Sequence, residues 1–341
     1  MKKLLNTLYI TSPNSYLIKD GENVVVKVDE KERFRIPVHN LESIVCFGYA
    51  GASPGLMYLC SERNVSLSFH NAYGRFIARL DGKVKGNVLL RRTQYRIADD
   101  RERSIPLIKH IVKAKILNSR SVLQRMARER EAKQELLESA IRKLKEKFRI
   151  VDNANEIEKI RGIEGDSANL YFSVFDQLIT KQKEDFFMKG RNRRPPLDNV
   201  NAMLSFVYVL LANDVQSALE SVGLDPYVGF YHTDRPGRPS LALDMMEELR
   251  AYMADRLVLS MINLKQVNKK GFTSKETGGV VMNDDTRKAV LTAWQKRKQE
   301  KITHPFLNEK ILLGLLPYSQ ALLMSRYMRG DIDDYPVFIL K

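Results

Sequence analysis

A turn rich in proline and glycine, followed by an acidic helical stretch, is the feature that most constrains this chain. Residues 229–250 read GFYHTDRPGRPSLALDMMEELR. The sequence PGRP cannot continue a helix, so His232 is predicted on a loop or at the end of a strand. Beyond the turn, Ser240 is expected to cap an amphipathic helix over 241–262. The histidine is therefore expected close to the first turns of that helix.

Three carboxylates lie in this predicted helix, at Asp244, Glu247 and Glu248. Residues three apart project from neighbouring points of one helical face, so Asp244 and Glu247 are expected side by side. Glu248 points in another direction and is expected at the surface. An imidazole with one or two carboxylates suits a divalent metal that prefers oxygen and nitrogen ligands.

The net charge of the chain is strongly positive. Its 341 residues include 56 Lys and Arg against 41 Asp and Glu, a formal charge of +15. The excess is largest over residues 101–200, which carry 23 basic and 15 acidic side chains. This predicts an anionic partner, and nucleic acid is favoured over a membrane because no lipid-seeking helix stands out. The alternative interpretation is that the charge serves solubility alone.

Several features predict a cytoplasmic protein that does not span a membrane. No apolar run is expected to approach the roughly 20 residues that cross a bilayer. The first residues, MKKLLNTLYI, contain neither an unbroken apolar segment nor a cleavage-like segment, so no signal peptide is expected. The cysteines, Cys46 and Cys60, are too few for a disulfide framework and are expected as buried thiols.

The predicted fold class is α+β. Up to about residue 95, short runs such as TLYIT, NVVVKV and SIVCF alternate with turn residues, including those at 72–74 and 81–82. A short helix is expected at 52–63, with Ser53 as its N-cap. From residue 106, apolar residues recur at helical spacing, first over 106–148 and last over 307–328. The predicted domains are a sandwich-like β domain over 1–95, a charged linker over 96–105 and an all-α domain over 106–341.

Glu164 is a further candidate, in the segment IRGIEGDSANLYF. It lies between Gly162 and Gly165, and the next helix is expected to begin at about Asp166. A carboxylate at a helix N-terminus is favoured by the helix dipole. Spacing alone favours an ordinary first-turn carboxylate over a functional one.

A basic loop is predicted at 189–196, with the sequence KGRNRRPP. No acidic residue within the run neutralises Arg191, Arg193 and Arg194. This favours contact with a nucleic-acid phosphate backbone over a merely solvated loop.

Eight segments, spread over essentially the whole chain, match one family in order and spacing. They are PNSYLIKDGENVVV, IVCFGYAGASPGLM, SLSFHNAYGRF, GNVLLRRTQYR, IRGIEGDSANLYF, RRPPLDNVNAMLSF, GLDPYVGFYHTDRPGRPSLALDMMEELR and DRLVLSMIN. These segments resemble the CRISPR-associated integrase of spacer acquisition, the adaptation nuclease of CRISPR-Cas systems. Among its versions, the chain is most similar to that of type I-C systems.

The resemblance implies a β-sandwich domain joined to an α-helical domain. It implies a homodimer through the β domains, and a complex in which two such dimers flank a dimer of a small ferredoxin-like adaptation partner. It also implies Mg²⁺ or Mn²⁺ bound by Glu164 of the GIEG segment, His232 of the GFYH segment and Glu247 of the LDMME segment. Asp244 matches a position at which some members carry an additional active-site aspartate.

The implied function is that of a metal-dependent DNA endonuclease and integrase. Its substrates are a captured double-stranded DNA fragment and the CRISPR repeat, and the 3′-OH of the fragment attacks a repeat phosphodiester. Two alternatives stay open. One is a generic structure-specific nuclease acting on branched DNA or RNA, and the other is a non-catalytic architectural DNA-binding protein.

Overall fold

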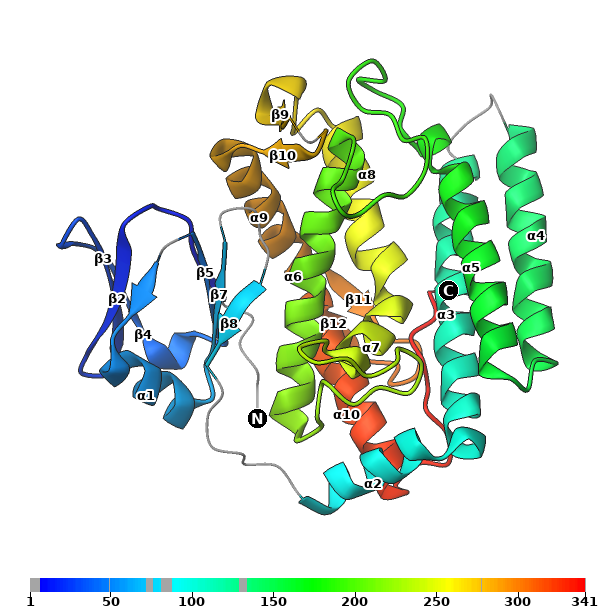
Figure 1. Cartoon of the computed structure of the whole chain (residues 1–341), viewed down its shortest axis with the longest axis horizontal. Coiled ribbons are helices and arrows are strands. Elements are labelled where there is room, and N and C mark those ends of the chain that lie inside the picture. The colour runs from blue at the N-terminus through cyan, green and yellow to red at the C-terminus, as the bar shows by residue number, and fades with distance from the viewer. Residues whose placement is uncertain are drawn as a thin grey trace. The chain divides into compact units, whose positions relative to one another are not determined.

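The computed structural model describes residues 7–48, 50–71, 76–80, 88–128, 134–276 and 278–340. The chain forms two compact units. The β unit comprises Met1–Lys85 and Asp284–Glu300, and the helical unit comprises Gly86–Asn283 and Lys301–Lys341. Strands dominate the first unit and helices the second, so the α+β class is confirmed (Figure 1).

The β unit contains two four-stranded sheets. One has the strand order β1-β5-β7-β8 and the other β4-β3-β2-β6. In the first sheet β5 pairs in parallel with β1 and β7, whereas β2, β3 and β4 form an antiparallel meander. The strands are β1 (Thr7–Ile10), β2 (Ser15–Asp20), β3 (Asn23–Val28), β4 (Lys31–Pro37), β5 (Ser43–Phe47), β6 (Gly51–Ala52), β7 (Ser66–His70) and β8 (Phe76–Arg79). The turns expected at 72–74 and 81–82 lie outside the described residues.

One apolar core joins both sheets to the predicted short helix, α1 (Pro54–Arg63). Leu17 and Ile44, from different sheets, are fully buried with Leu56 of α1. The Ser53 hydroxyl accepts a hydrogen bond from the Leu56 N–H at 3.3 Å, so the predicted N-cap is confirmed. Both cysteines are free and buried, as expected.

The boundaries between the units differ from the expected domains. Residues 96–99 and 101–105 are helical rather than a linker, because they belong to α2 (Val88–Asp99) and α3 (Arg101–Arg128). A polar residue, Gln94, lies on the buried face of α2 between Leu90 and Ile97 and obscured the helical period. Helix α9 (Asp284–Lys298) belongs to the β unit, where its Gln295 amide donates to the Thr7 carbonyl at 3.0 Å.

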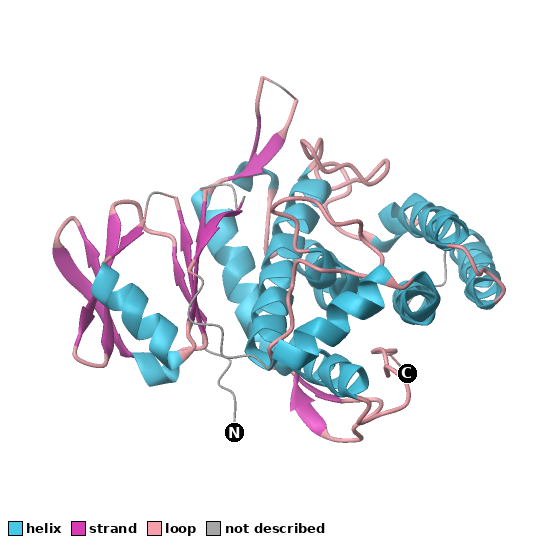
Figure 2. Ribbon diagram, turned by 60° about the horizontal axis from the view of Figure 1, so that its bottom comes forward, coloured by secondary structure: helices cyan, strands magenta, loops and turns pink. Residues whose placement is uncertain are grey.

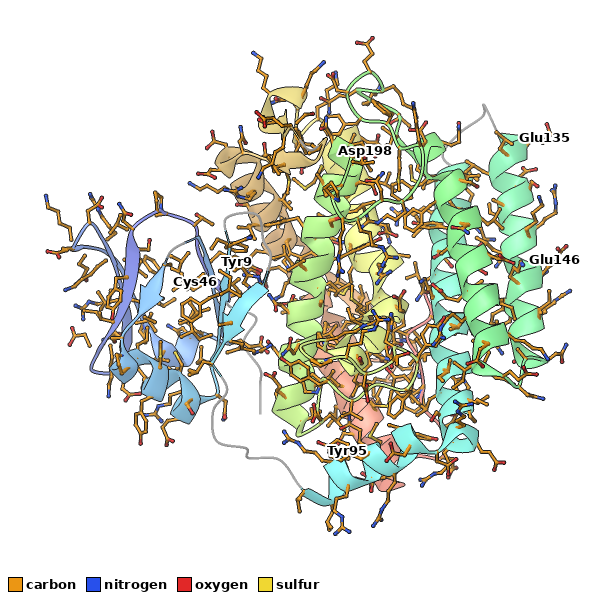
Figure 3. All side chains as sticks on the ribbon, viewed as in Figure 1. Tyr9, Cys46, Tyr95, Glu135, Glu146 and Asp198 are labelled. Atoms are coloured by element: carbon orange, nitrogen blue, oxygen red, sulfur yellow. The ribbon has the colours of Figure 1, made fainter. Side chains whose placement is uncertain are left out.

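The helical unit is built around α3, which packs against α4, α5 and α7. Its remaining helices are α4 (Gln134–Asp152), α5 (Ile157–Ser173), α6 (Asn199–Val222), α7 (Ser240–Arg250), α8 (Arg256–Asn263) and α10 (Leu316–Arg329). Short 3-10 helices occur at Val38–Asn40 in the β unit and at Phe175–Leu178, Lys269–Gly271 and Leu313–Leu315 here. On α4, Glu135 and Glu146 are exposed (Figure 3), opposite the buried Leu137 and Leu144.

The described residues of the stretch 106–148 are helical as expected and form the hairpin of α3 and α4. Two of the later expected helices differ in detail. The last helix begins only at Leu316, because a hairpin of β11 (Lys301–Thr303) and β12 (Lys310–Leu312) precedes it. A second hairpin is formed by β9 (Phe272–Ser274) and β10 (Val280–Met282), and the strands of both appear in magenta in Figure 2. A π-helical turn, Ala251–Asp255, joins α7 to α8.

Helix α6 is the one helix of the described residues that is long and apolar enough to cross a membrane. Polar residues such as Asn201 and Ser205 interrupt it, so no unbroken apolar run reaches that length, and 61% of its apolar window is buried inside the protein. Asp198 caps its N-terminus by accepting from the Asn201 N–H at 2.7 Å. Gly223, at φ 88°, ends it in the left-handed conformation that favours glycine.

The C-terminal segment 331–340, here called the C-terminal strap, covers Glu248. The Glu248 carboxylate accepts hydrogen bonds from the Tyr335 hydroxyl and the Phe338 N–H, both at 2.5 Å, and from the Gln320 amide at 3.0 Å. Asn118 of α3 donates to the Glu248 and Phe338 carbonyls at 2.6 and 2.8 Å. Glu248 is fully buried, so its expected surface position is wrong. Helical phase alone could not show that a distant segment folds over this face.

The buried Glu248 makes stability depend on pH. Burial raises its pKa from 4.5 to about 7, and this outweighs the hydrogen bonds that lower it. The folded protein therefore holds the Glu248 proton more tightly than the unfolded chain. The resulting stabilisation is complete below about pH 4.5 and is lost as the pH rises through 7.

We predict that Glu248→Gln removes this dependence. Between pH 5 and 8, the free energy of unfolding of the wild type should fall relative to the variant by up to about 3 kcal/mol, as urea denaturation would measure. Glu309→Gln, at an exposed position in the same unit, should follow the wild type. Parallel profiles for the wild type and Glu248→Gln would contradict this account.

Candidate active site

A cavity of about 360 Å³ in the helical unit brings together residues that are distant in the sequence. Glu164 reaches it from α5, His232 from the loop after α6, and Glu247 from α7. Its lining consists of Lys115, Arg161, Glu164, Arg193, Tyr231, His232, Thr233, Arg235, Arg238 and Glu247. Two carboxylates and an imidazole thus meet within a strongly basic surface.

Asp244 fixes the loop that carries His232. This fully buried carboxylate accepts three backbone hydrogen bonds, from Phe230 at 2.7 Å and from Tyr231 and His232 at 2.9 Å. Its Oδ1 is also 2.6 Å from the His232 Nδ1. Because a carboxylate only accepts hydrogen bonds, Nδ1 is the donor, and in the neutral ring Nε2 then carries the lone pair. Asp244 therefore orients the ring and leaves Nε2 free to accept a ligand.

Gly229 allows the loop to approach α7 this closely. A Cβ atom at this position would lie 2.8 Å from both the Asp244 Oδ2 and the Ser240 carbonyl carbon. Ser240 was expected as the N-cap, but it is the first residue of α7 and makes no cap hydrogen bond. Its hydroxyl donates instead to the Thr233 carbonyl at 3.3 Å, across the turn.

Glu164 lies in the middle of α5 rather than at a helix N-terminus. The helix runs from Ile157 to Ser173 through both Gly162 and Gly165. A glycine inside a helix costs only about 1 kcal/mol, and packing of the buried Ile160 and Tyr171 side chains outweighs that cost. The Tyr231 hydroxyl donates to Glu164 at 3.4 Å from across the cavity.

Lys115 is a residue of this site that the sequence did not single out. Its ammonium forms ion pairs with Glu164 Oε1 and, at 2.7 Å, with Glu247 Oε2. The side chains of Lys115, Glu164 and Glu247 are 14%, 18% and 5% exposed. The available signal was a lysine on the apolar stripe of α3, one turn from the buried Ile111 and Ser119.

The charges around Glu247 keep it ionised. Burial opposes ionisation, but the charges of Arg250 and Lys115 outweigh it and lower the Glu247 pKa to about 2. Arg250 contacts Glu247 Oε1 at 2.7 Å. In the same region, burial and the nearby carboxylates raise the pKa of Tyr231, so its hydroxyl stays protonated and can donate.

The donor set was tested for its fit to a divalent cation. As the side chains lie, the described ranges contain no group of three His, Cys, Asp or Glu residues that encloses an ion. Glu164 and Glu247 are instead joined by the Lys115 ammonium, a cation that takes the contacts expected of a metal. Among the described residues, the buried Glu247 Oε2 has this ion pair and no hydrogen bond. Two carboxylates and one imidazole nitrogen fit Mg²⁺ or Mn²⁺ chemically, provided that Lys115 moves away.

The predicted basic loop contributes unequally to the cavity. Arg193 lines it, but Arg191 turns inward, donating to the Asn201 amide oxygen at 2.7 Å and the Ser205 hydroxyl at 3.1 Å. The Arg191 guanidinium is bound within the fold over the Tyr208 ring, and its expected contact with DNA stays a prediction. Arg194 is exposed and outside the lining.

Three arginines of the lining were missed from the sequence: Arg161, Arg235 and Arg238. With Arg193 they form the set that we call the arginine cluster. Burial and the charges of Arg235, Arg194 and Arg161 lower the pKa of Arg238. Arg161 stands three residues before Glu164, and Arg235 and Arg238 follow His232 closely, so sequence proximity to the site residues was the available signal.

We predict that Gly229→Ala displaces the His232 loop. The added methyl group must push aside Asp244 or Ser240, which should lower the free energy of unfolding by about 1–3 kcal/mol in urea denaturation. Gly162→Ala, where a Cβ meets nothing within 4 Å, should be neutral or slightly stabilising. Equal effects of the two substitutions would show that the close approach at Gly229 is unimportant.

Comparison with known proteins identifies the family. The family model described as CRISPR associated protein Cas1 matches residues 8–296. The chain is 52% identical over 341 residues to the CRISPR-associated endonuclease Cas1 1 of Chlorobaculum tepidum, with 99% of each chain covered.

Two solved structures share the fold. A casposase bound to its integration product superposes with a TM-score of 0.84 at 21% identity, covering 96% of this chain and 92% of that one. A Cas6-RT-Cas1–Cas2 complex also gives 0.84, at 22% identity, covering 98% of this chain and 36% of that one. From the family model and the Chlorobaculum relative, the chain belongs to the Cas1 family of CRISPR-associated proteins.

Proposed function

We propose that the chain is a metal-dependent DNA endonuclease and integrase that inserts captured fragments into a CRISPR array. The carrying observation is the cavity in which Glu164, His232 and Glu247 meet beside the arginine cluster. The Chlorobaculum relative is named an endonuclease, and the casposase of similar fold is described with an integration product. Both support a reaction at a DNA phosphodiester.

In this proposal, Glu164, Glu247 and His232 would hold Mg²⁺ or Mn²⁺, and Asp244 keeps the imidazole in the required orientation. The bound ion would supply a Lewis acid that neutralises charge on the attacked phosphate and the leaving oxygen. The 3′-OH of the captured strand loses its proton and attacks a repeat phosphorus. One P–O bond forms as the P–O bond to the leaving 3′ oxygen breaks, and that oxygen gains a proton. Attack by water instead gives cleavage.

The arginine cluster is suited to hold the DNA backbone around the reacting phosphate. Within the described residues, no ion pair occupies Arg193, Arg235 or Arg238. Arg161 donates to the Tyr231 carbonyl at 3.3 Å, which keeps it beside the His232 loop. One guanidinium can bind two phosphate oxygens at once, and it does not read the base sequence. We therefore expect DNA binding that tolerates different sequences and weakens as the salt concentration rises.

In this function the chain would form a homodimer through its β domains and a complex with a small ferredoxin-like adaptation partner. The reaction would take place in the cytoplasm. The Cas6-RT-Cas1–Cas2 complex supports a partner protein, because it contains Cas2 and its similar fold covers 98% of this chain.

We predict that His232→Ala abolishes strand joining, by at least about 100-fold, when a 3′-OH oligonucleotide is incubated with repeat DNA, partner and Mn²⁺. His39→Ala, exposed in the β unit, should retain wild-type activity. Duplex binding should persist in both variants. Cleavage without joining by the wild type would favour a generic nuclease, and joining unaffected by His232→Ala would favour an architectural protein.

We predict that combined Arg235→Ala and Arg238→Ala substitutions weaken DNA binding electrostatically. The slope of log affinity against log salt should become shallower by about 2, since each lost phosphate contact contributes about 0.9. Fluorescence anisotropy with duplexes of unrelated sequence should show the same loss. Arg149→Ala, exposed on α4, is the control for loss of one charge elsewhere. An unchanged slope in the double variant would exclude these arginines from the DNA interface.

A further inference from the structure

The Lys115 ammonium and the proposed metal compete for the same oxygen atoms. Lys115 contacts Glu164 Oε1 and Glu247 Oε2, whereas Arg250 takes the other oxygen of Glu247, Oε1. The two carboxylates and two basic side chains are thereby balanced in charge. Bringing a divalent cation to the carboxylates while Lys115 stays would place like charges in contact at a largely buried site.

The fold provides somewhere for the Lys115 side chain to go. Lys115 lines the 360 Å³ cavity as well as holding the carboxylates. A lysine has a flexible four-carbon stem and a freely rotating ammonium, so its head group can move while its backbone stays in α3. The rest of the basic lining, the arginine cluster, is directed to the same cavity. An ammonium released by the carboxylates would therefore meet any phosphate bound there.

We propose that Lys115 is a positioning residue that exchanges partners when the site is loaded. Without metal, it holds Glu164 and Glu247 together. When a divalent cation binds, it releases both carboxylates and pairs with the DNA phosphate in the cavity. This inference rests on the proposed function, because it assumes that Glu164 and Glu247 are metal ligands.

The exchange has two thermodynamic consequences. Metal binding by the free protein is weakened by the ammonium that must be displaced. A phosphate anion in the cavity attracts the displaced ammonium, so phosphate and metal strengthen each other's binding. Both consequences disappear when position 115 carries no charge, which gives a readout other than catalysis.

The test is calorimetric titration of the full chain with MnCl₂, without DNA. Lys115→Met should bind Mn²⁺ at least about tenfold more tightly than the wild type. Lys115→Arg, which keeps the charge, should stay close to the wild type. Lys113→Met is the matched control, two residues before Lys115 on α3. The Lys113 ammonium pairs with Asp152 at 2.6 Å, and its removal should leave Mn²⁺ binding unchanged.

Two further measurements accompany the titration. In chelator, Lys115→Met should melt about 4 °C or more below the wild type, because the two carboxylates then lack a shared cation, and Mn²⁺ should restore the loss. Inorganic phosphate should tighten Mn²⁺ binding several-fold in the wild type and not in Lys115→Met. If Lys115→Met does not fold in chelator, Lys115→Gln, with a neutral hydrogen-bond donor, carries the same expectations.

The outcomes separate this inference from the proposed function. In one outcome, the wild type binds Mn²⁺, His232→Ala does not, and Lys115→Met binds no more tightly than the wild type. This result overturns the role of Lys115 alone. Absence of Mn²⁺ binding in every variant overturns both. Tighter binding by Lys115→Met, with wild-type behaviour in Lys113→Met, supports the exchange.

Discussion

The interaction on which the site depends is the hydrogen bonding of one buried carboxylate, Asp244. A buried charge is costly unless hydrogen-bond donors surround it, and here three backbone N–H groups and the His232 ring surround it. The donors belong to consecutive residues, so the loop wraps around the carboxylate. Gly229 makes this possible because a side chain there would occupy the space of Asp244. His232 is thereby fixed relative to α7, which also carries Glu247.

A second constraint is charge balance in a largely buried place. Glu164 and Glu247 come from helices far apart in the sequence, and without a cation their mutual repulsion would oppose packing of α5 and α7 against α3. Lys115 and Arg250 supply the compensating charges. The C-terminal strap covers another face of α7 by hydrogen bonding to Glu248, so the two adjacent glutamates have different roles. Glu247 faces the cavity, and Glu248 anchors the end of the chain.

The sequence was sufficient for the features encoded locally. The β texture, the α1 cap at Ser53 and the turn before α7 all follow from nearby residues. The placement of His232 beside Asp244 follows from that turn as well. The choice of Glu164, in contrast, depended on the family resemblance, because two glycines suggested a helix start that packing of α5 overrides.

Features created by distant segments were not predictable in this way. Arg191 and Arg193 are two residues apart in one basic loop, yet only Arg193 lines the cavity, because Asn201 and Ser205 of α6 bind the other. Glu248 was misplaced because the strap that buries it lies some 90 residues further along the chain. Lys115 appeared to be one lysine among many, and only the convergence of α3, α5 and α7 shows that it joins two carboxylates.

The central claim is that Glu164, His232 and Glu247 bind one divalent cation. The most direct measurement is a crystal structure of the full chain soaked in Mn²⁺, with anomalous scattering recorded near the manganese edge. The account predicts one strong anomalous peak among the two carboxylates and the His232 Nε2, with the Lys115 ammonium moved into the cavity. A peak elsewhere, or Lys115 still joining Glu164 and Glu247 at saturating Mn²⁺, would contradict it.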